Sequence, residues 1–445
     1  MSTLRIYDDL NEARATLLRR DSLRDIPIPA WLSDSLAALF GEPLTPDEAV
    51  RRIIRSVREH GDAALFDWNA RIDGAQLNAL TVPESEIAAA LDAIPAGVAE
   101  ALRYAAERIR AFHEKQPVTG WVDAAREGSL GQLIRPVDSV GVYVAGGTAP
   151  LPSSLLMSAI PAQVAGVREI VVTTPPARGT GAVPPVILAA AAVCGLTKVV
   201  RVGGAQAIAA LAYGTESVPR VAKIVGPGNL FVTLAKQQVY GDVGLDGLPG
   251  PTETMVIADE SADPALAAAD LLAQAEHDVL AAAILVTPSR ALAERVATEV
   301  ERRVPALSRA TIIAQSLDNR SGAVIVRDLD EAFAVANDYA AEHLCLLVAN
   351  PWDWVGHVRN AGGVFLGETS FEVLGDYVAG PSHVMPTGGT ARFASPLNAL
   401  DFVKITSLVG LEARAAAELS KVAAVLARAE ALTAHAAAAE ARSER

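Results

Sequence analysis

Two identical tripeptides, Ala-Glu-His, contain two of the seven histidines of this chain, at residues 275–277 and 341–343. Ahead of the first, Gln274 stands three residues before His277 on a predicted helix, so the two side chains share a face. Imidazole nitrogen and carboxylate oxygen are zinc ligands, and Asp376 and His435 are further candidates. Spacing alone leaves both a zinc site and a scattered set of ordinary polar residues open.

The second tripeptide places a carboxylate directly beside an imidazole. Glu342 and His343 lie between the helix-like stretch 333–340 and the strand-like stretch 344–348. Such a boundary exposes side chains to a crevice, where the pair could perform general acid–base catalysis. A histidine that simply meets the dipole at the end of a helix explains the same residues equally well.

Three glycine-rich turns each follow an apolar run: Gly146-Gly147, Gly203-Gly204 and Gly226-Pro227-Gly228. Turns of this kind bind phosphates through backbone N–H groups and helix N-termini. The usual dinucleotide fingerprint, G-x-G-x-x-G, is missing from the sequence. The three turns are therefore compatible with a nucleotide crevice and with a purely structural role.

The elements that carry these residues alternate between strand and helix. Apolar runs, turns and helical patterns follow one another from about residue 140 to 340, which predicts βαβ units and parallel sheets. Upstream, Thr45 and Glu48 have capping-box spacing before an apolar helical face, and a second helical pattern spans about 84–114 with an interruption near Pro95. From about residue 411 the chain is alanine-rich and helical.

The predicted fold class is α/β, with two Rossmann-like lobes. We expect an N-terminal helical segment (1–22), a first lobe with the catalytic and metal residues (23–142 and 252–397), a second lobe that binds the cofactor (143–251), and a C-terminal helical segment (398–445).

Composition narrows the class of protein. The 445 residues are 51% apolar and carry a net charge of −14, with 52 acidic and 38 basic side chains. No basic stripe is present, which argues against nucleic acid and anionic membranes as partners. Two isolated cysteines and an N-terminus without an apolar signal region predict a protein of the reducing cytoplasm.

The ordered motifs resemble the histidinol dehydrogenase family over about residues 20–440. The resemblance rests on "GVYVAGGTAPLPSSLLMSAIPA", "GGAQAIAALAYGTE", "KIVGPGNLFVTLAK", "DVGLDGLPGPTETMVIADE", "LLAQAEHD", "AEHL", "GDYVAGPSHVMPTGGTAR" and "LTAH", in that order. It implies the oxidation of L-histidinol to L-histidine, the last steps of histidine biosynthesis, in two hydride transfers to NAD with one Zn²⁺ per subunit.

The same resemblance implies a role for each candidate residue. The implied zinc ligands are Gln274, His277, Asp376 and His435, with the imidazole and amine of the substrate completing the shell. Glu342 and His343 are implied as the acid–base pair, His343 taking the alcohol proton and Glu342 activating water. Tyr143, Gln206 and Asn229 match NAD contacts. The implied substrate contacts are Thr252, His383 and Glu430, together with Gln274, His277, His343, Asp376 and His435.

The family is a homodimer whose C-terminal segment crosses to the partner. This implies that Glu430 and His435 serve the site of the other subunit, with small terminal helical segments exchanged. No nucleic acid or membrane partner is implied.

Four positions depart from the common family pattern. Thr252 replaces serine, Ala341 and Ala145 replace proline, and Ser382 replaces asparagine. These changes alter backbone restraint and hydrogen bonding near the site, and they bear on substrate identity more than on chemistry. The alternatives are a related NAD-dependent dehydrogenase acting on another polar alcohol, such as a sulfonated diol, a zinc hydrolase, and an inactive member.

Overall fold

The computed structural model describes residues 4–20, 30–124, 127–146 and 150–443. Gly147 of the first glycine turn and the expected boundary between residues 22 and 23 lie outside these ranges. The chain forms two compact units, residues 1–115 with 138–401, and residues 116–137 with 402–445. Each unit is described by itself.

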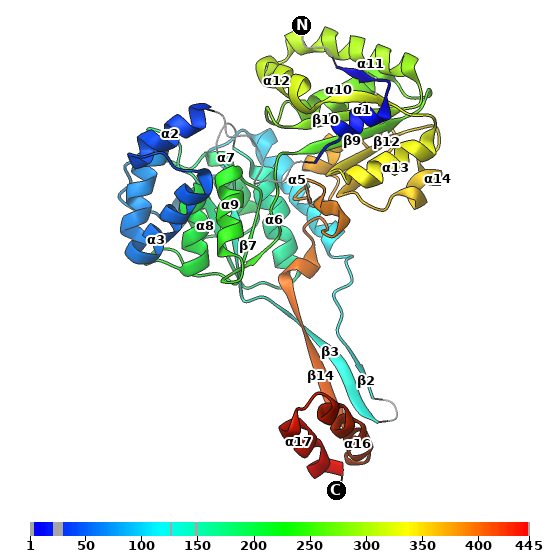
Figure 1. Ribbon diagram of the computed structural model, residues 1–445. Helices are drawn as coiled ribbons and strands as arrows, with labels where there is room; N and C mark the ends of the chain where they lie inside the picture. Colours follow the sequence, from blue (N-terminus) through cyan, green and yellow to red (C-terminus); the bar gives the residue numbers. More distant parts are fainter. Residues whose placement is uncertain (1–3, 21–29, 125–126, 147–149, 444–445) are drawn as a thin grey trace. The chain divides into compact units, whose positions relative to one another are not determined.

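A six-stranded parallel sheet forms the first lobe of the larger unit, in the order β1-β11-β10-β9-β12-β13 (Figure 1). Its strands are β1 (Ile6–Tyr7), β9 (Glu253–Ala258), β10 (Ala282–Thr287), β11 (Gly322–Ile325), β12 (His343–Leu347) and β13 (Gly363–Leu366). Every residue of β9 and β10 is buried. Strands that are buried along their whole length and mostly apolar are what a parallel sheet covered on both faces requires.

Helices cover both faces of this sheet. Val256 and Ala258 of β9 pack with α10 (Pro264–Ala275), α11 (Arg290–Arg303) and α12 (Ala310–Arg320). Met255 and Ile257, which point the other way, pack with α1 (Leu10–Ala15) and α13 (Leu329–Tyr339). The alternation follows from the two-residue period of a strand. The shorter helices here are η2 (Val304–Ala306), α14 (Pro351–Trp354), η3 (Val355–His357), α15 (Glu372–Tyr377), η4 (Thr390–Arg392) and η5 (Ala399–Phe402).

A five-stranded parallel sheet, in the order β6-β5-β4-β7-β8, forms the second lobe (Figure 1). Its strands are β4 (Ser139–Tyr143), β5 (Glu169–Thr174), β6 (Val199–Arg201), β7 (Lys223–Val225) and β8 (Gly244–Leu245). The helices between them are α6 (Pro152–Val164), α7 (Pro185–Val193), α8 (Gly204–Tyr213) and α9 (Leu230–Val239). The α/β class with two parallel-sheet lobes is confirmed.

The helices before this sheet pack on the second lobe. α3 (Pro46–Trp68) begins at the predicted capping box, in which Thr45 and Glu48 each accept the other's backbone N–H. Its apolar face joins the core around α8 and α9. α2 (Ala30–Phe40) packs on α3, whereas α4 (Glu84–Ala89) and α5 (Ala96–His113) pack on α6 and α7. A π-helical turn, η1 (Asn69–Asp73), follows α3.

These contacts differ from the expected division of the chain. The expected first lobe includes residues 46–113, but they lie against the second lobe, whose sheet begins at Ser139 rather than at residue 143. The N-terminal segment contains strand β1 as well as a helix, because Ile6 and Tyr7 pair with β11. An apolar helix face does not specify which of two lobes it will cover.

The smaller unit is an antiparallel ribbon followed by two helices. β14 (Val403–Leu411) pairs along β3 (Gly128–Pro136), and β2 (Trp121–Asp123) pairs on the other side of β3. The alanine-rich tail forms α16 (Ala413–Ala429) and α17 (Thr433–Ser443), as predicted. Among the helices that the structure describes, none combines the length and the hydropathy that crossing a bilayer needs.

Candidate active site

Most of the residues expected to do chemistry gather where β9 and β12 begin. We call this group the catalytic edge: Thr252 and Glu253 at the start of β9, Glu342 and His343 at the start of β12, Gln274 and His277 at the end of α10, and Asp376 on α15. Because β9 and β12 are paired neighbours, His343 lies directly opposite Thr254. The parallel register therefore brings together residues that stand some 90 positions apart in the chain.

Glu342 is a buried carboxylate whose position is fixed by two donors. Its Oε2 accepts a hydrogen bond from Thr252 Oγ1 at 2.6 Å and another from the backbone N–H of Glu253 at 3.0 Å. Burial raises the pKa of Glu342 to about 7, against the lowering effects of His343 and of the two donors. A carboxyl group with a pKa near neutrality can both accept and return a proton under ordinary conditions.

His343 is oriented by a backbone carbonyl. Its Nδ1 lies 3.2 Å from the carbonyl oxygen of Glu253, which can only accept, so in the neutral ring Nδ1 carries the proton. The lone pair is thereby placed on Nε2, which is buried and has no hydrogen-bond partner among the described residues. Nε2 faces the carboxylate of Asp376 at 3.8 Å. This arrangement leaves one nitrogen of His343 free to take a proton.

Three of the four expected zinc ligands belong to the catalytic edge. Gln274 Oε1 accepts from Thr254 Oγ1 at 3.1 Å, while its Nε2 has no partner among the described residues. His277 keeps access to solvent, yet lost hydration lowers its pKa, while the charge of Asp376 acts in the opposite direction. Zinc accepts an imidazole nitrogen and a carboxylate oxygen, and the amide of Gln274 would be a less usual third donor.

No three histidine, cysteine, aspartate or glutamate side chains within the described ranges are grouped as a ready metal site. The expected set is consistent with this finding, because one of its members is a glutamine and His435 belongs to the smaller unit. His435 lies on α17 and Glu430 caps the end of α16, and both are exposed. The structure does not place these two residues relative to the catalytic edge.

The expected substrate contacts Thr252 and His383 are both engaged by protein atoms. The hydroxyl of Thr252 is donated to Glu342. His383 Nδ1 lies 2.8 Å from the carbonyl oxygen of Asp376, and its Nε2 lies 3.2 Å from Ser154 Oγ on α6. Burial lowers the pKa of His383, so the neutral ring is favoured. His383 thus links the second lobe to the catalytic edge.

The sequence interpretation missed two ionisable residues at this edge. Glu372 is buried, accepts a hydrogen bond from Thr254, and lies 3.7 Å from His343 Nδ1. Burial and the charge of Asp376 raise the pKa of Glu372 well above its usual range. Arg20 forms an ion pair with Glu253 and contacts the carbonyl oxygen of Tyr339 at 3.1 Å. The spacing of Glu372 and Asp376, four apart on one helix, was the available signal; Arg20 offered none.

The three expected cofactor contacts lie at the carboxyl ends of the strands of the second lobe. We call this group the cofactor edge: Tyr143 at the end of β4, Gln206 in the first turn of α8, and Asn229 before α9. Tyr143 accepts a hydrogen bond from the N–H of Gly204 at 3.2 Å, and burial raises its pKa to about 12. Asn229 Oδ1 caps α9 by accepting from the N–H groups of Phe231 and Val232.

Several of the buried polar atoms that lack a hydrogen-bond partner lie at the same two edges. At the cofactor edge they include both amide atoms of Gln206 and the hydroxyls of Thr173 and Thr174; at the catalytic edge they include Gln274 Nε2 and His343 Nε2, all within the described ranges. Folded proteins rarely leave such groups unsatisfied, because each one costs about 1–3 kcal/mol. Both edges therefore have unused hydrogen-bonding capacity, which fits a bound nucleotide at one and a metal with substrate at the other.

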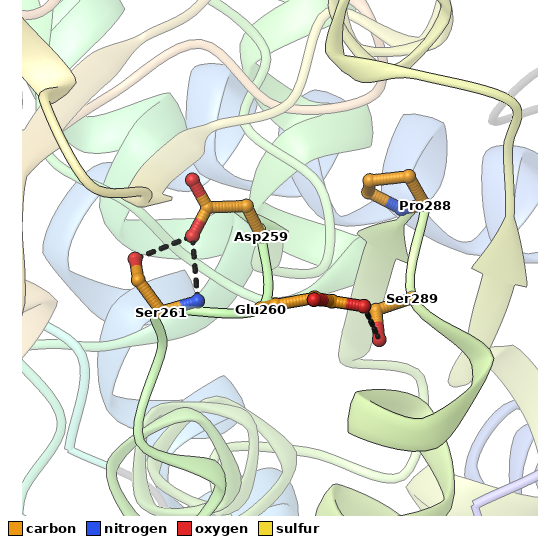
Figure 2. Close-up of a pocket in the computed structure, with 5 residues that line it drawn as sticks. All are labelled: Asp259, Glu260, Ser261, Pro288 and Ser289. Carbon is orange, nitrogen blue, oxygen red and sulfur yellow. Dashed lines mark hydrogen bonds between the residues drawn. The ribbon is translucent and has the colours of Figure 1, made fainter.

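A hollow of about 350 Å³ lies at the opposite, carboxyl end of β9 and β10 and is lined by Asp259, Glu260, Ser261, Pro288 and Ser289 (Figure 2). Its polar groups bond mainly to one another: Ser261 donates to Asp259 through N–H at 2.9 Å and through Oγ at 2.5 Å. Ser289 Oγ lies 3.4 Å from Glu260. Because its polar groups are already hydrogen-bonded, this hollow has fewer free donors and acceptors for a ligand than the catalytic edge has.

Comparison with known proteins agrees with this geometry. The family model described as histidinol dehydrogenase matches residues 44–443. A histidinol dehydrogenase of Deinococcus radiodurans is 53% identical over 433 residues, covering 97% of this chain and 98% of the relative. A histidinol dehydrogenase of Thermus thermophilus is 53% identical over 392 residues, which cover 88% of this chain and 93% of the relative. The crystal structure of histidinol dehydrogenase from Elizabethkingia anophelis superposes with a TM-score of 0.90 at 32% identity, covering 99% and 98%.

Proposed function

This chain belongs to the histidinol dehydrogenase family, and on that premise we propose that it oxidises L-histidinol to L-histidine through L-histidinal, with NAD and zinc. The family assignment makes it an oxidoreductase. The pairing of a buried Glu342 with a His343 whose Nε2 is unpartnered among the described residues carries the proposal of how it works. The reaction removes four electrons as two hydrides.

In the alcohol step, His343 takes the hydroxyl proton of the substrate on Nε2. The carbonyl oxygen of Glu253 supports this role, because it keeps the other proton of the ring on Nδ1. Asp376, 3.8 Å from Nε2, stabilises the imidazolium that results. NAD, when bound, supplies the acceptor for each of the two hydrides.

In the aldehyde step, Glu342 removes a proton from the water that adds to the aldehyde carbon. Its pKa of about 7 suits this task, since the ionised form is abundant at neutral pH while the acid can still return a proton. Thr252 and the N–H of Glu253 hold the carboxylate in one orientation. The extra methyl group of Thr252, relative to serine, does not prevent its hydrogen bond to Glu342.

Gln274, His277 and Asp376, with His435, would hold the zinc. Zinc, when bound, would hold and orient the substrate through its imidazole and amine. Tyr143, Gln206 and Asn229 would bind NAD, and Thr252, His383 and Glu430 would contact the substrate. The supporting observations are the N/O donor set at the catalytic edge and the unpartnered amide of Gln206 at the cofactor edge, both within the described ranges.

We further propose a homodimer in which the smaller unit docks on a second copy. Its helix α16 exposes Val422, Val425 and Leu426 at 60%, 68% and 61%, and β14 exposes Ile405 and Val409 at 57% and 71%. Exposed apolar side chains on a ribbon and on the helix that follows it mark an interaction surface. In this arrangement Glu430 and His435 serve the site of the other subunit. The free, buried cysteines Cys194 and Cys345 suit a reducing cytoplasm.

The decisive experiment follows NADH absorbance with L-histidinol and with a panel of other polar alcohols, including a sulfonated diol. We expect L-histidinol to be preferred, with two NADH formed for each histidine. A chelator should abolish the reaction and zinc should restore it. A preference for another alcohol would identify a related dehydrogenase. Turnover at the same rate with and without NAD would identify a hydrolase.

A further inference from the structure

A buried ion pair lies beside the Gly226-Pro227-Gly228 turn. Lys236 of α9 and Asp246, which follows β8, have side chains that are 1% and 3% exposed, and Lys236 Nζ lies 2.7 Å from Asp246 Oδ1. Burying two charges is costly unless further hydrogen bonds satisfy the remaining donors and acceptors. The partners that satisfy this pair therefore indicate what it holds in place.

Both members of the pair bind the same residue of the turn. Lys236 Nζ donates to the carbonyl oxygen of Gly226 at 2.6 Å, and the N–H of Gly226 donates to Asp246 Oδ2 at 2.7 Å. The backbone of Gly226 is thus held through both of its polar groups. Charge-assisted hydrogen bonds are about twice as strong as neutral ones, which makes this a firm attachment.

Gly226 needs such an attachment because of where its backbone lies. Its φ is +111°, and a Cβ at this position would stand 2.1 Å from the carbonyl oxygen of Tyr143. The turn therefore passes directly against the end of β4, which carries one of the expected NAD contacts. Three residues later Asn229 starts α9 and provides a second such contact.

The pair also joins the cofactor edge to the segment that leads to the catalytic edge. Asp246 opens the connection from β8 to Thr252 and β9. Nearby, Thr233 Oγ1 of α9 donates to the carbonyl oxygen of Pro249 in the same connection, at 2.8 Å. α9 thus holds this connection at two points, and of these two the Lys236–Asp246 pair is the one that reaches Gly226.

On the basis of the proposed function, we propose that Lys236 and Asp246 are positioning residues of the NAD site. By fixing both polar groups of Gly226, they hold the turn against Tyr143 and set the place of Asn229 at the start of α9. NAD then binds to a turn that is already in shape and spends little free energy on ordering it. Neither side chain needs to touch the cofactor.

The test is the double variant Lys236→Met/Asp246→Asn, which leaves no unpaired buried charge. The amide that replaces the carboxylate still offers an acceptor to the Gly226 N–H, but the donor to the Gly226 carbonyl oxygen is lost. We expect the Kd of NAD, measured by titration calorimetry, to rise about tenfold, the effect of one good hydrogen bond. The affinity for L-histidine and the zinc content should stay within about twofold of wild type, because neither depends on Gly226.

Thr233→Val is the matched control, because it removes a buried hydrogen bond from the same helix to the same connection without contacting Gly226. It should lower thermal stability and leave the Kd of NAD unchanged. A folded double variant that binds NAD like wild type overturns the proposal, as does an equal loss of NAD affinity in Thr233→Val.

Should the double variant fail to fold, Lys236→Arg decides. It keeps the charge opposite Asp246, but the carbon of its guanidinium group takes the place of Nζ and its donors point elsewhere, so the bond to the Gly226 carbonyl oxygen is disturbed. NAD affinity should therefore still fall, and unchanged affinity overturns the proposal. Wild-type protein that does not bind NAD at all would instead contradict the proposed function.

Discussion

At the scale of single residues, the proposed function assigns different tasks to two identical tripeptides. His277 stands at the end of α10 beside Gln274, with access to solvent and to Asp376. His343 begins a buried strand and is oriented by the carbonyl oxygen of Glu253. A metal ligand must present a lone pair to a shared centre, whereas a general base must present one to the substrate. The two surroundings suit these two tasks.

The two histidines should therefore fail differently when they are replaced. His277→Ala removes a proposed ligand, so the zinc content of purified protein should fall together with activity. His343→Ala should keep the zinc and lose about 10²- to 10⁴-fold in kcat, the usual reach of acid–base catalysis. Metal analysis by mass spectrometry and steady-state kinetics separate the two effects. Equal zinc loss in both variants would contradict the division of tasks.

The pH dependence of kcat should reflect the protonation of Glu342. Its pKa is raised to about 7 by burial, so below that pH the group is protonated and cannot activate water. The kcat for oxidation of L-histidinal should then fall about tenfold for each pH unit on the acidic side.

Thr252→Val tests the assignment of this titration, since it removes a hydrogen bond that lowers the pKa of Glu342. The acidic limb should move to higher pH by about one pH unit, because a hydrogen bond to a charged group has that strength. Thr252→Ser keeps the donor and should leave the limb in place. If Thr252→Val does not shift the acidic limb of the pH profile, the limb reflects the titration of a group other than Glu342.

At the scale of elements, the sequence predicted what local signals encode. The capping box at Thr45 started α3 at the expected residue, the interruption near Pro95 separated α4 from α5, and the alanine-rich tail is helical. Glycine turns and apolar runs located most strands of both sheets, but not the short β1 and β8 or the edge strand β13. Each of these signals acts within a few residues, which is why a single sequence reveals it.

Contacts between distant segments could not be predicted in the same way. The face of α3 is apolar, but nothing in its own residues says that α8 and α9 will cover it. Likewise Lys236 and Asp246 appear as ordinary charges until folding places them beside Gly226. The family resemblance, rather than spacing, supplied the roles of the site residues, and it gave none to Glu372 or Arg20.

One strained position at the end of α13 allows an element-scale prediction. Ala340 caps this helix with φ +54° and ψ +60°, the left-handed conformation that costs a residue with a Cβ about 1 kcal/mol. Ala340→Gly should therefore increase the free energy of unfolding by about 1 kcal/mol. The same change at the exposed Ala334, inside α13, should instead decrease it by about 1 kcal/mol.

Chemical denaturation of wild type and of the two glycine variants measures whether each substitution increases or decreases the free energy of unfolding. The cap lies two residues before Glu342, so kcat should be recorded with stability. Destabilisation by Ala340→Gly would show that the alanine methyl group contributes packing that outweighs its backbone strain.

At the scale of the whole molecule, the smaller unit has little core of its own. Of its two tail helices, only Ala415, Ala424 and Ala436 are buried among the described residues, and alanine contributes little apolar area. Helices this poor in buried surface gain most of their stability by docking elsewhere. The exposed valines and leucines of α16 would supply that contact in the proposed homodimer.

The proposed dimer makes a prediction that a monomeric site cannot meet. If each site combines His343 of one subunit with His435 of the partner subunit, the variants His343→Ala and His435→Ala are each inactive alone. In a mixed dimer, one site then receives both defects and the other receives neither. With random reassortment about half of the dimers are mixed, and each has one intact site of two, so independent sites should recover about a quarter of wild-type activity.

Mass spectrometry of intact dimers must first show that the subunits have exchanged, and the matched control is a mixture of His343→Ala with Glu342→Ala. Glu342 and His343 both stand at the start of β12, so each site takes both residues from one and the same subunit. Every site of these mixed dimers therefore keeps one defect, and activity should stay at the level of the parents. Recovery in the first mixture alone requires His435 to act across the interface. With exchange demonstrated and no recovery in the first mixture, His435 must serve its own subunit, and the smaller unit would need another reason for its exposed apolar surface.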